Sequence, residues 1–343
     1  MSDNATSPAV TAVAKTEAPT RTFTFRFSGD GGEFFKIWIV NLLLTVVTLG
    51  IYSAWATVRT SQYFYGHTKL DQTGFQYLAN PLSILIGRVI AVAIFGLVML
   101  AASFQPMLYG VLMVLAIPAV PWLMVRAMRF NLRNTAYRNV RFDFVGTYGE
   151  AAKVFLLYYL GVIFSLGLAG PWWLLQTKKF FINNARYGDH AFDCSCPTKE
   201  FYILALITLG AMIPVLLVAM LLGWIPVIGQ IVIFLAYLSI FALWQSWVRN
   251  LLFNHTRLAG DVQLSSNVTM FDLAMLYAMN ALLVVVTLGI ALPWVMVRTA
   301  KFYAERTAVQ AADLDRFTAS QNQVAGSAIG DEVAGVFALE VGI

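Results

Sequence analysis

Long apolar runs separated by short polar segments dominate the pattern of this chain. Four runs are each about 20 residues long, the length of helix that crosses the hydrocarbon core of a bilayer. These predicted membrane-spanning helices cover residues 82–104, 108–128, 201–224 and 225–248. Within each pair the connection is short and uncharged, whereas every other connection between helices carries Lys or Arg. The positive-inside rule therefore predicts that the uncharged connections face the periplasm and the basic ones face the cytoplasm.

Three further apolar segments match one another and predict an internal repeat. A shift of 117 positions places Phe25, Phe27, Gly29, Gly32, Glu33, Lys36, Leu49, Gly50 and Trp55 on Phe142, Phe144, Gly146, Gly149, Glu150, Lys153, Leu166, Gly167 and Trp172. A shift of 239 positions places Asn41, Thr48, Leu49, Gly50, Trp55, Val58, Arg59 and Thr60 on Asn280, Thr287, Leu288, Gly289, Trp294, Val297, Arg298 and Thr299. These matches are too numerous for composition alone, so we expect three copies of one element.

The repeated elements cover residues 34–65, 151–182 and 273–303. Each is about 32 residues long, whereas two full crossings of a bilayer need about 40. A segment that enters and leaves on one side must therefore turn back inside the membrane. The Leu-Gly pairs at 49–50, 166–167 and 288–289 are the expected turns, because Gly relaxes the backbone. The alternative is a single tilted span per element.

Short stretches after the helices alternate between apolar and other residues, which is typical of β-strands. Residues 67–77, 134–144, 184–194 and 255–264 each predict a hairpin, and Phe23, Phe25 and Phe27 predict a first strand. Phe337, Leu339, Val341 and Ile343 predict a last one. The expected fold is thus an α-helical integral membrane protein. It has four full spans, three broken or re-entrant helices and a small cytoplasmic layer of short strands that caps them.

Composition supports the membrane class. The chain is 59% hydrophobic and 12% charged, whereas soluble domains carry roughly 25% charged residues. This excludes a disordered chain and disfavours a soluble multidomain enzyme. We expect a disordered N-terminal tail over residues 1–21, a membrane domain over 22–306 and an acidic C-terminal tail over 307–343 that ends in the last strand. Both termini are expected in the cytoplasm.

The formal net charge is +5, and the acidic tail leaves the membrane domain more basic still. Basic residues beside membrane helices are typical of the cytoplasmic rim of a membrane protein. Membrane lipids are therefore the expected partners, and nucleic acid is not.

Several of these basic residues are candidate binding residues. Arg59, Arg126 and Arg298 each lie near the cytoplasmic end of a predicted helix, and Trp55 and Trp294 precede two of them by about one turn. Positive-inside charge with interfacial aromatic residues explains this pattern. The alternative is a ring of cations that binds a lipid head group or a small anionic ligand.

Arg88 is a separate candidate, because it lies about six residues inside a predicted span. A guanidinium at that depth is costly unless it meets a partner, a polar cavity or the interface. Arg88 is therefore either part of a functional site or a side chain that extends to the nearby interface.

Other chemistry is absent from the sequence. Cys194 and Cys196 are too close for an unstrained disulfide and lack the second pair typical of a zinc site. The turn at residues 29–32 is not followed by the Lys-Ser or Lys-Thr pair of a P-loop, which excludes that motif. We expect no catalytic residues, no metal and no cofactor, so the chain is not expected to be an enzyme.

The chain also resembles a known family. The residues that carry the resemblance are Phe34-Phe35-Lys36-Ile37-Trp38, Asn41, Thr48-Leu49-Gly50-Ile51-Tyr52, Trp55, Arg59, Tyr63-Phe64-Tyr65-Gly66, His67-Thr68, Gly87-Arg88 and Gly330-Asp331-Glu332. They are similar to the signature of the YjgN-like bacterial inner-membrane family, over nearly the whole chain from residue 23. Ala54 departs from the Pro expected before the Trp, so the first break is expected to be less kinked. The resemblance implies a multi-pass bacterial inner-membrane protein of unknown function and carries over no site residues.

Two functions remain open at this point. Broken helices build midplane sites in transporters, which favours a transporter or channel for a small solute or lipid. The alternative is a non-enzymatic membrane organiser or scaffold that binds lipid head groups or a cytoplasmic partner. A water-accessible cavity that reaches the Leu-Gly breaks would favour transport, whereas a sealed helix bundle would favour the scaffold.

Overall fold

Ten short strands form a closed antiparallel barrel at the base of the molecule. The computed structural model describes residues 20–225 and 227–312. The strands are β1 Arg21–Phe27, β2 Thr68–Leu70, β3 Thr73–Tyr77, β4 Thr135–Tyr137, β5 Val140–Phe144, β6 Ala185–Tyr187, β7 His190–Cys194, β8 Thr256–Leu258, β9 Val262–Ser266 and β10 Thr307–Ala311. Each strand pairs with its neighbours in sequence, and β1 pairs with β10 to close the barrel. The predicted small layer of strands is therefore wrong.

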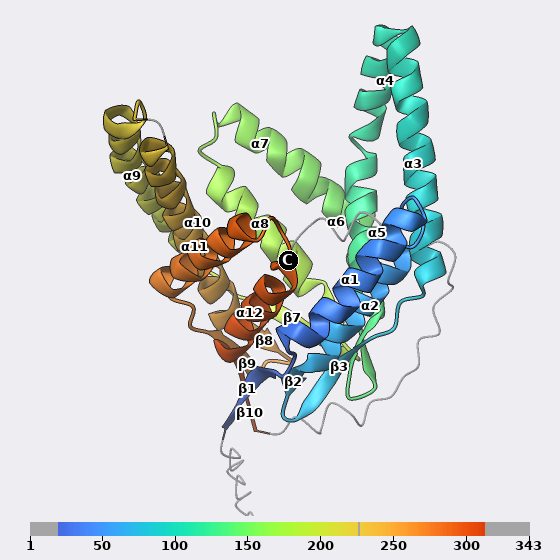
Figure 1. Ribbon diagram of the computed structural model, residues 1–343, viewed down its shortest axis with the longest axis vertical. Coiled ribbons are helices and arrows are strands. Elements are labelled where there is room, and N and C mark those ends of the chain that lie inside the picture. Colours follow the sequence, from blue (N-terminus) through green and yellow to red (C-terminus); the bar gives the residue numbers. More distant parts are fainter. Residues whose placement is uncertain (1–19, 226, 313–343) are drawn as a thin grey trace, which may run out of the picture.

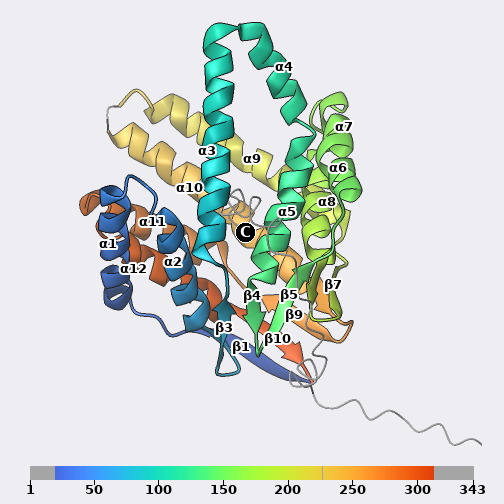
Figure 2. The same cartoon turned by 90° about the vertical axis from the view of Figure 1, so that its right-hand side faces the viewer.

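The helices form five groups that are inserted between the strands, and we call each group a helical hairpin. The groups are α1 Gly31–Val47 with α2 Ser53–His67; α3 Pro81–Phe104 with α4 Pro106–Ala116 and α5 Ala119–Arg133; α6 Tyr148–Ala152, the π-helical turn η1 Lys153–Leu157, and α7 Tyr158–Phe164 with α8 Gly170–Asn183; α9 Thr198–Leu222 with α10 Ile228–Asn254; and α11 Met270–Val286 with α12 Leu292–Glu305. Each hairpin has an outgoing limb and a returning limb. All five rise from the same rim of the barrel, and α3 and α4 extend farthest from it (Figures 1 and 2).

The strand hairpins form where the sequence predicts them, because their turns suit tight reversals. Asp71 and Gln72 have φ of 47° and 64°, and Arg138 and Asn139 have φ of 48° and 64°. Positive φ at both central residues is the geometry that matches the twist of two-residue hairpins. The strands of each pair then connect at the end of the barrel opposite the helices, which explains why all helices leave from one rim.

Aromatic side chains fill the barrel. Phe25 stacks on Phe75 with ring centroids 6.0 Å apart, and Phe142 stacks on both Phe75 and Phe192 at 6.5 Å. A buried tyrosine layer lies beside this stack. The Tyr137 hydroxyl donates to the carbonyl of Leu70 at 2.7 Å, and the Tyr187 hydroxyl donates to the carbonyl of Tyr137 at 2.9 Å. The barrel is therefore a packed core, as small barrels usually are.

The three predicted Leu-Gly breaks share one turn geometry. Leu49, Leu166 and Leu288 all have φ near 50°, and the Gly that follows each has φ between 88° and 93°. The N–H of each Gly bonds to the carbonyl five residues earlier at 2.8 Å, which is the bond that closes a Schellman motif. The hydroxyls of Thr48, Ser165 and Thr287 each accept from the backbone N–H four residues later. Each chain segment therefore reverses at its Leu-Gly pair, and both limbs end at the barrel.

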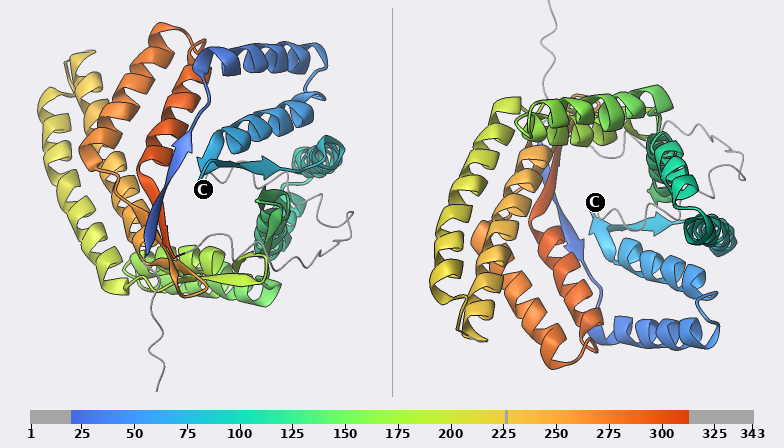
Figure 3. Two further views of the ribbon diagram at one scale, coloured as in Figure 1. Left: turned by 90° about the horizontal axis from the view of Figure 1, so that it is seen from below. Right: turned by 90° about the horizontal axis from the view of Figure 1, so that it is seen from above.

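The helices themselves form a closed ring above the barrel (Figure 3). Neighbouring hairpins pack in sequence order, and α12 packs against α1 to complete the circle. Trp294 of α12 stacks on Phe35 of α1 with centroids 5.0 Å apart. Gly31 permits this contact, since a side chain there would approach Trp294 to 2.3 Å. The first and last hairpins are thus held together both by the barrel and by their helices.

The structure does not show the four full spans that the sequence predicts. In the described residues, α3, α9 and α10 are long and apolar enough to cross a membrane, with mean hydropathies of 2.6, 2.6 and 1.9. The predicted span over 108–128 instead consists of α4 and α5, which bend by 47° at residues 117–118. Pro118 lies at this break, where the missing N–H and the ring of proline interrupt a helix. The pair counts as a fourth span only if both helices are taken together.

Parts of the predicted tails lie outside the described residues. These are residues 1–19 and 313–343, including the expected last strand over 337–343. The first residues of the expected acidic tail, Thr307–Ala311, form β10 of the barrel.

Candidate functional site

Arg88 of α3 joins the hairpin that precedes it. Its guanidinium donates to the Ser53 hydroxyl at 2.5 Å and to the Thr57 hydroxyl at 2.9 Å. Both hydroxyls belong to the first turns of α2, directly after the Leu49–Gly50 break. They donate their own protons to the carbonyls of Gly50 and Ser53, so their lone pairs remain available to Arg88. The half-buried arginine therefore has a polar partner at the beginning of a returning helix.

Arg59 and Trp55 lie farther along the same returning helix. Arg59 is exposed, and its guanidinium carbon lies 5.8 Å from the centre of the Tyr52 ring. Trp55 stacks almost parallel to Tyr52 at 6.1 Å. The three residues follow one face of α2, so Arg59 is supported by its own helix and remains available to solvent or lipid.

Arg126 and Arg298 occupy corresponding places on α5 and α12. Arg126 is half-buried and lies 5.7 Å from the centre of the Trp122 ring. Arg298 is exposed and lines a cavity of about 280 Å³ together with Lys301 and Arg306. The Asp272 carboxylate of this cavity is paired with Arg306 at 3.0 Å. Trp294, in contrast, belongs to the contact between α12 and α1.

Two further cations complete this set. Lys178 lies on α8, and Arg249 lies on α10. Arg249 lies 4.4 Å from the Phe253 ring and 4.5 Å from the Tyr303 ring, and it donates to the Thr307 hydroxyl at 2.9 Å. This arginine joins α10 to α12 and β10, so its role is structural. Each of the five returning limbs thus carries a cation near the barrel, but the structure distributes them around the ring instead of bringing them to one centre.

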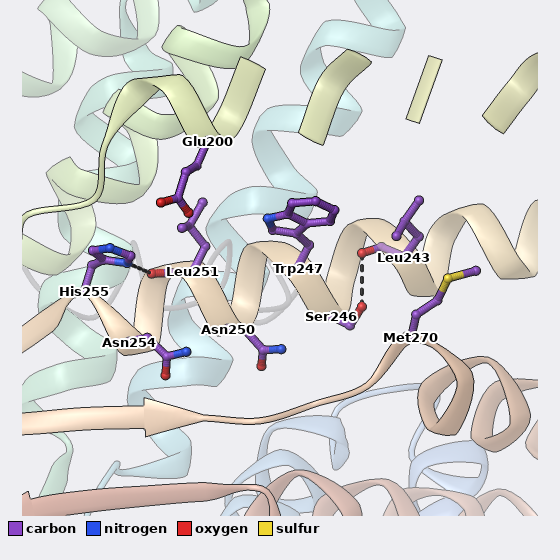
Figure 4. Close-up of a pocket in the computed structure, with 9 residues that line it drawn as sticks. All are labelled: Glu200, Leu243, Ser246, Trp247, Asn250, Leu251, Asn254, His255 and Met270. Atoms are coloured by element: carbon purple, nitrogen blue, oxygen red, sulfur yellow. Dashed lines mark hydrogen bonds between the residues drawn. The ribbon is translucent and has the colours of Figure 1, made fainter. Parts of the chain in front are cut away.

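A larger cavity lies beside α10 at the end nearest the barrel (Figure 4). Its volume is about 390 Å³. The lining residues are Glu200, Leu243, Ser246, Trp247, Asn250, Leu251, Asn254, His255 and Met270, from α9, α10, the segment before β8 and α11. Sequence reasoning missed this site, because only the fold brings these elements together. One signal was present, namely an acid at Glu200 three residues after Pro197.

The two cysteines form part of the packing instead. Cys194 and Cys196 are free and buried, and they occupy the end of β7 and the residue before Pro197. The corresponding pair in the first hairpin is Phe27 and Gly29, where a side chain at Gly29 would approach the Phe27 ring to 2.7 Å. A smaller residue at the strand end thus leaves room for a larger one two positions later. The hydrogen bond between the thiols lowers the pKa of Cys194 and raises that of Cys196.

The described residues contain no group of three or more His, Cys, Asp or Glu side chains placed to hold a metal ion.

Comparisons with known proteins give the family. The family model described as "Bacterial protein of unknown function (DUF898)" matches residues 22–336. The inner membrane protein YjgN of Salmonella typhimurium is 28% identical over an alignment of 355 residues, gaps included. The alignment covers 85% of this chain and 89% of that protein. YjgN of Escherichia coli K12 is 26% identical over 165 residues, covering 47% of this chain and 40% of that protein. No solved structure matches the chain. The chain therefore belongs to the YjgN-like DUF898 family of bacterial membrane proteins of unknown function.

Proposed function

We propose that the chain is a multi-pass, non-enzymatic inner-membrane protein that organises the bilayer by binding the head groups of anionic lipids. The observation that carries this proposal is a charge pattern common to all five helical hairpins. Each hairpin contains one long segment without Asp, Glu, Lys or Arg, over residues 37–58, 89–125, 154–177, 201–248 and 273–297. Each of these segments ends directly before a cation on the returning limb, at Arg59, Arg126, Lys178, Arg249 and Arg298.

This pattern favours one placement in the membrane. The apolar tips are strongly exposed, with Leu49, Leu166 and Leu288 each more than 90% accessible. Such side chains suit a lipid environment and not water. The bilayer then surrounds the charge-free segments, and the barrel lies in the cytoplasm by the positive-inside rule. Since β1 pairs with β10, the described ends of the chain lie on that same side.

Four of these cations suit lipid head groups better than a single ligand. Arg59, Arg126, Lys178 and Arg298 lie on different helices around the ring, and we call them the cation belt. Each basic residue near an anionic membrane surface contributes about 1 kcal/mol of attraction. The packed barrel interior also disfavours an open pore along its axis.

We further infer that the three Leu-Gly hairpins are internal repeats, because they share both sequence and turn geometry.

Lipid analysis of the purified protein tests this proposal. In the belt variant, Gln replaces all four cations: Arg59→Gln, Arg126→Gln, Lys178→Gln and Arg298→Gln. This variant should retain several-fold less phosphatidylglycerol than the native protein when both are extracted from mixed phosphatidylglycerol–phosphatidylcholine vesicles. Arg26→Gln with Lys69→Gln is the matched control, since these paired residues lie on the barrel strands β1 and β2. Equal phosphatidylglycerol retention by the belt variant and the native protein would contradict the proposal.

Transport of a small solute or lipid is a second candidate. It is favoured by the interrupted hairpins and by Arg88, which contacts the first turns after one interruption. A cysteine at Ser53 would distinguish the two functions. Labelling of this position by an impermeant thiol reagent from the periplasmic side would indicate a water-filled path and favour transport, with a small anionic solute as the expected substrate. Protection from that side favours the lipid organiser.

A further inference from the structure

The Glu200 carboxylate differs from its counterparts in the other hairpins. Glu150 accepts from the backbone N–H of Thr147 at 3.1 Å, and Asp272 pairs with Arg306 at 3.0 Å. Glu33 accepts from the Tyr63 hydroxyl at 3.4 Å. Within residues 20–225 and 227–312, the Glu200 carboxylate has no hydrogen bond and no ion pair. It is therefore an unpaired, half-buried anion.

The local sequence explains why Glu200 is unpaired. In a capping box, the third helical residue accepts from the backbone N–H of the N-cap residue, as Glu150 does. The N-cap residue of α9 is Pro197, which has no backbone N–H to donate. The carboxylate cannot close the box, and it lines the 390 Å³ cavity instead (Figure 4).

The cavity offers an aromatic ring beside this anion. Leu243, Trp247, Asn250 and Asn254 recur at helical spacing along α10 and form its floor. The nitrogen-bearing edge of Trp247 faces the side on which Glu200 lies (Figure 4). The indole is half-buried, so part of its surface is available to a ligand.

The remaining polar groups are largely engaged by the protein. The Asn250 side chain accepts from the Ser266 hydroxyl and the Val268 N–H, and it donates to the Val268 carbonyl. The Asn254 side-chain oxygen accepts from the Ser266 N–H. His255 uses Nδ1 to contact the Leu251 carbonyl at 2.8 Å, which leaves Nε2 for a ligand. The Glu200 carboxylate accepts hydrogen bonds, so in this cavity it can bind an ammonium group, which has three N–H donors.

The position of Glu200 in the sequence indicates the depth of the cavity in the membrane. It lies directly before the charge-free segment 201–248, at the place where three other outgoing limbs carry Lys36, Arg88 and Lys153. The flanking helices α9 and α10 are both long enough to span a bilayer. Leu206 and Leu209 of α9 are exposed farther along, where acyl chains can lie. The cavity thus lies at head-group depth if the hairpins are placed as proposed above.

We infer that this cavity binds the head group of phosphatidylethanolamine, with its primary ammonium on the Glu200 carboxylate beside Trp247. The volume lies within the range of about 300–1,000 Å³ typical of ligand sites. The inference rests on the proposed membrane placement but not on the cation belt. It concerns a zwitterionic lipid, whereas the belt concerns anionic ones.

Binding measurements on the intact protein in detergent micelles test the inference. Native mass spectrometry should show that Glu200→Gln weakens binding of dioleoyl-phosphatidylethanolamine by about tenfold or more, as expected for the loss of one charged hydrogen bond. Glu33→Gln is the matched control, because that carboxylate has partners inside the protein, and it should leave this affinity unchanged. Trp247→Leu, which removes the aromatic surface but keeps the charge, should also weaken binding.

Phosphatidylglycerol with the same acyl chains separates this inference from the proposed function. Glu200→Gln should leave phosphatidylglycerol binding unchanged, which also shows that the variant is folded. Unchanged phosphatidylethanolamine affinity in Glu200→Gln, or an equal loss for both lipids, would overturn the inference. Full displacement of the lipid by millimolar phosphoethanolamine would also overturn it, because the ligand would then be a soluble amine. Failure of the native protein to bind phosphatidylglycerol would count against the cation belt alone.

Discussion

Replacing Arg88 by Leu tests whether this arginine joins two helical hairpins or only extends to the interface. Its guanidinium makes two hydrogen bonds, to Ser53 at 2.5 Å and to Thr57 at 2.9 Å. Hydrogen bonds to charged groups contribute about 1.5–3 kcal/mol each, so the two together contribute roughly 3–6 kcal/mol. An arginine inside a membrane helix costs about 2.5–3.5 kcal/mol on insertion scales. The net change in stability in Arg88→Leu is therefore expected to lie between a gain of about 0.5 kcal/mol and a loss of about 3.5 kcal/mol.

A double-mutant cycle removes this uncertainty, because the insertion cost of arginine cancels in the coupling energy. The cycle combines Arg88→Leu with the pair Ser53→Ala and Thr57→Ala. The free energy of unfolding is measured in mixed micelles by circular dichroism. We expect a coupling of about 3 kcal/mol, the lower end of the sum of the two hydrogen bonds and the upper end of couplings between contacting residues. Arg88→Lys should keep about half of this stabilisation, since an ammonium lacks the planar fork.

Arg59→Leu is the control for this cycle, because Arg59 is exposed and, within the described part of the chain, its guanidinium lies near the Tyr52 ring and makes no hydrogen bond. It should show no coupling to the same two hydroxyls. A coupling below about 0.5 kcal/mol for Arg88 would refute the reasoning. The arginine would then extend to the interface, and the hydrogen bonds to α2 would contribute nothing to the fold.

Two further predictions concern the barrel and the last hairpin. Tyr137→Phe should lower the free energy of unfolding by about 1–2 kcal/mol, because it removes a buried hydrogen bond to the Leu70 carbonyl. Tyr65→Phe is the control, since the Tyr65 hydroxyl makes no hydrogen bond within the described residues, and equal stability of both variants would contradict the packed barrel. The Arg306 guanidinium lowers the pKa of Asp272. The ion pair therefore stabilises the hairpin above the ordinary carboxyl pKa of about 4 and loses this effect as the pH falls further. Asp272→Asn should abolish that part of the acid sensitivity in a melting series from pH 6 to pH 3, and an unaltered pH profile would show that the pair contributes nothing.

Local features of this fold could be predicted from the sequence. The strand hairpins follow from alternation over a few residues, and the helix reversals follow from Leu-Gly pairs. Closure of the barrel could not be predicted, because it depends on pairing between β1 and β10 across nearly the whole described chain. Strands of three to seven residues carry too little pattern to specify such a pairing. The bend within the predicted span over 108–128 could not be predicted, because hydropathy does not register the break at Pro118.

The candidate sites, like the fold, were predictable only in their local features. A polar partner for Arg88 could be expected from its depth in the predicted span. That the partners are Ser53 and Thr57 depends on how α3 packs against α2, which the sequence does not show. Arg59, Arg126 and Arg298 were predicted near the ends of separate helices, and the structure distributes them around the ring without bringing them to one centre. The cavity beside Glu200 escaped prediction, since two hairpins, α9 with α10 and α11 with α12, contribute to its wall.

The sidedness of the barrel turns tests the central claim most directly. In a Cys194→Ala, Cys196→Ala background, single cysteines replace Gln72, Asn139, Gly260 or Gln105, and intact cells are treated with an impermeant thiol reagent. The first three positions lie in turns at the far end of the barrel, and Gln105 lies at the tip of the hairpin formed by α3 to α5. We predict labelling at Gln105 alone, because all five hairpins insert from one cytoplasmic barrel. Labelling of Asn139 from outside the cell would contradict that arrangement.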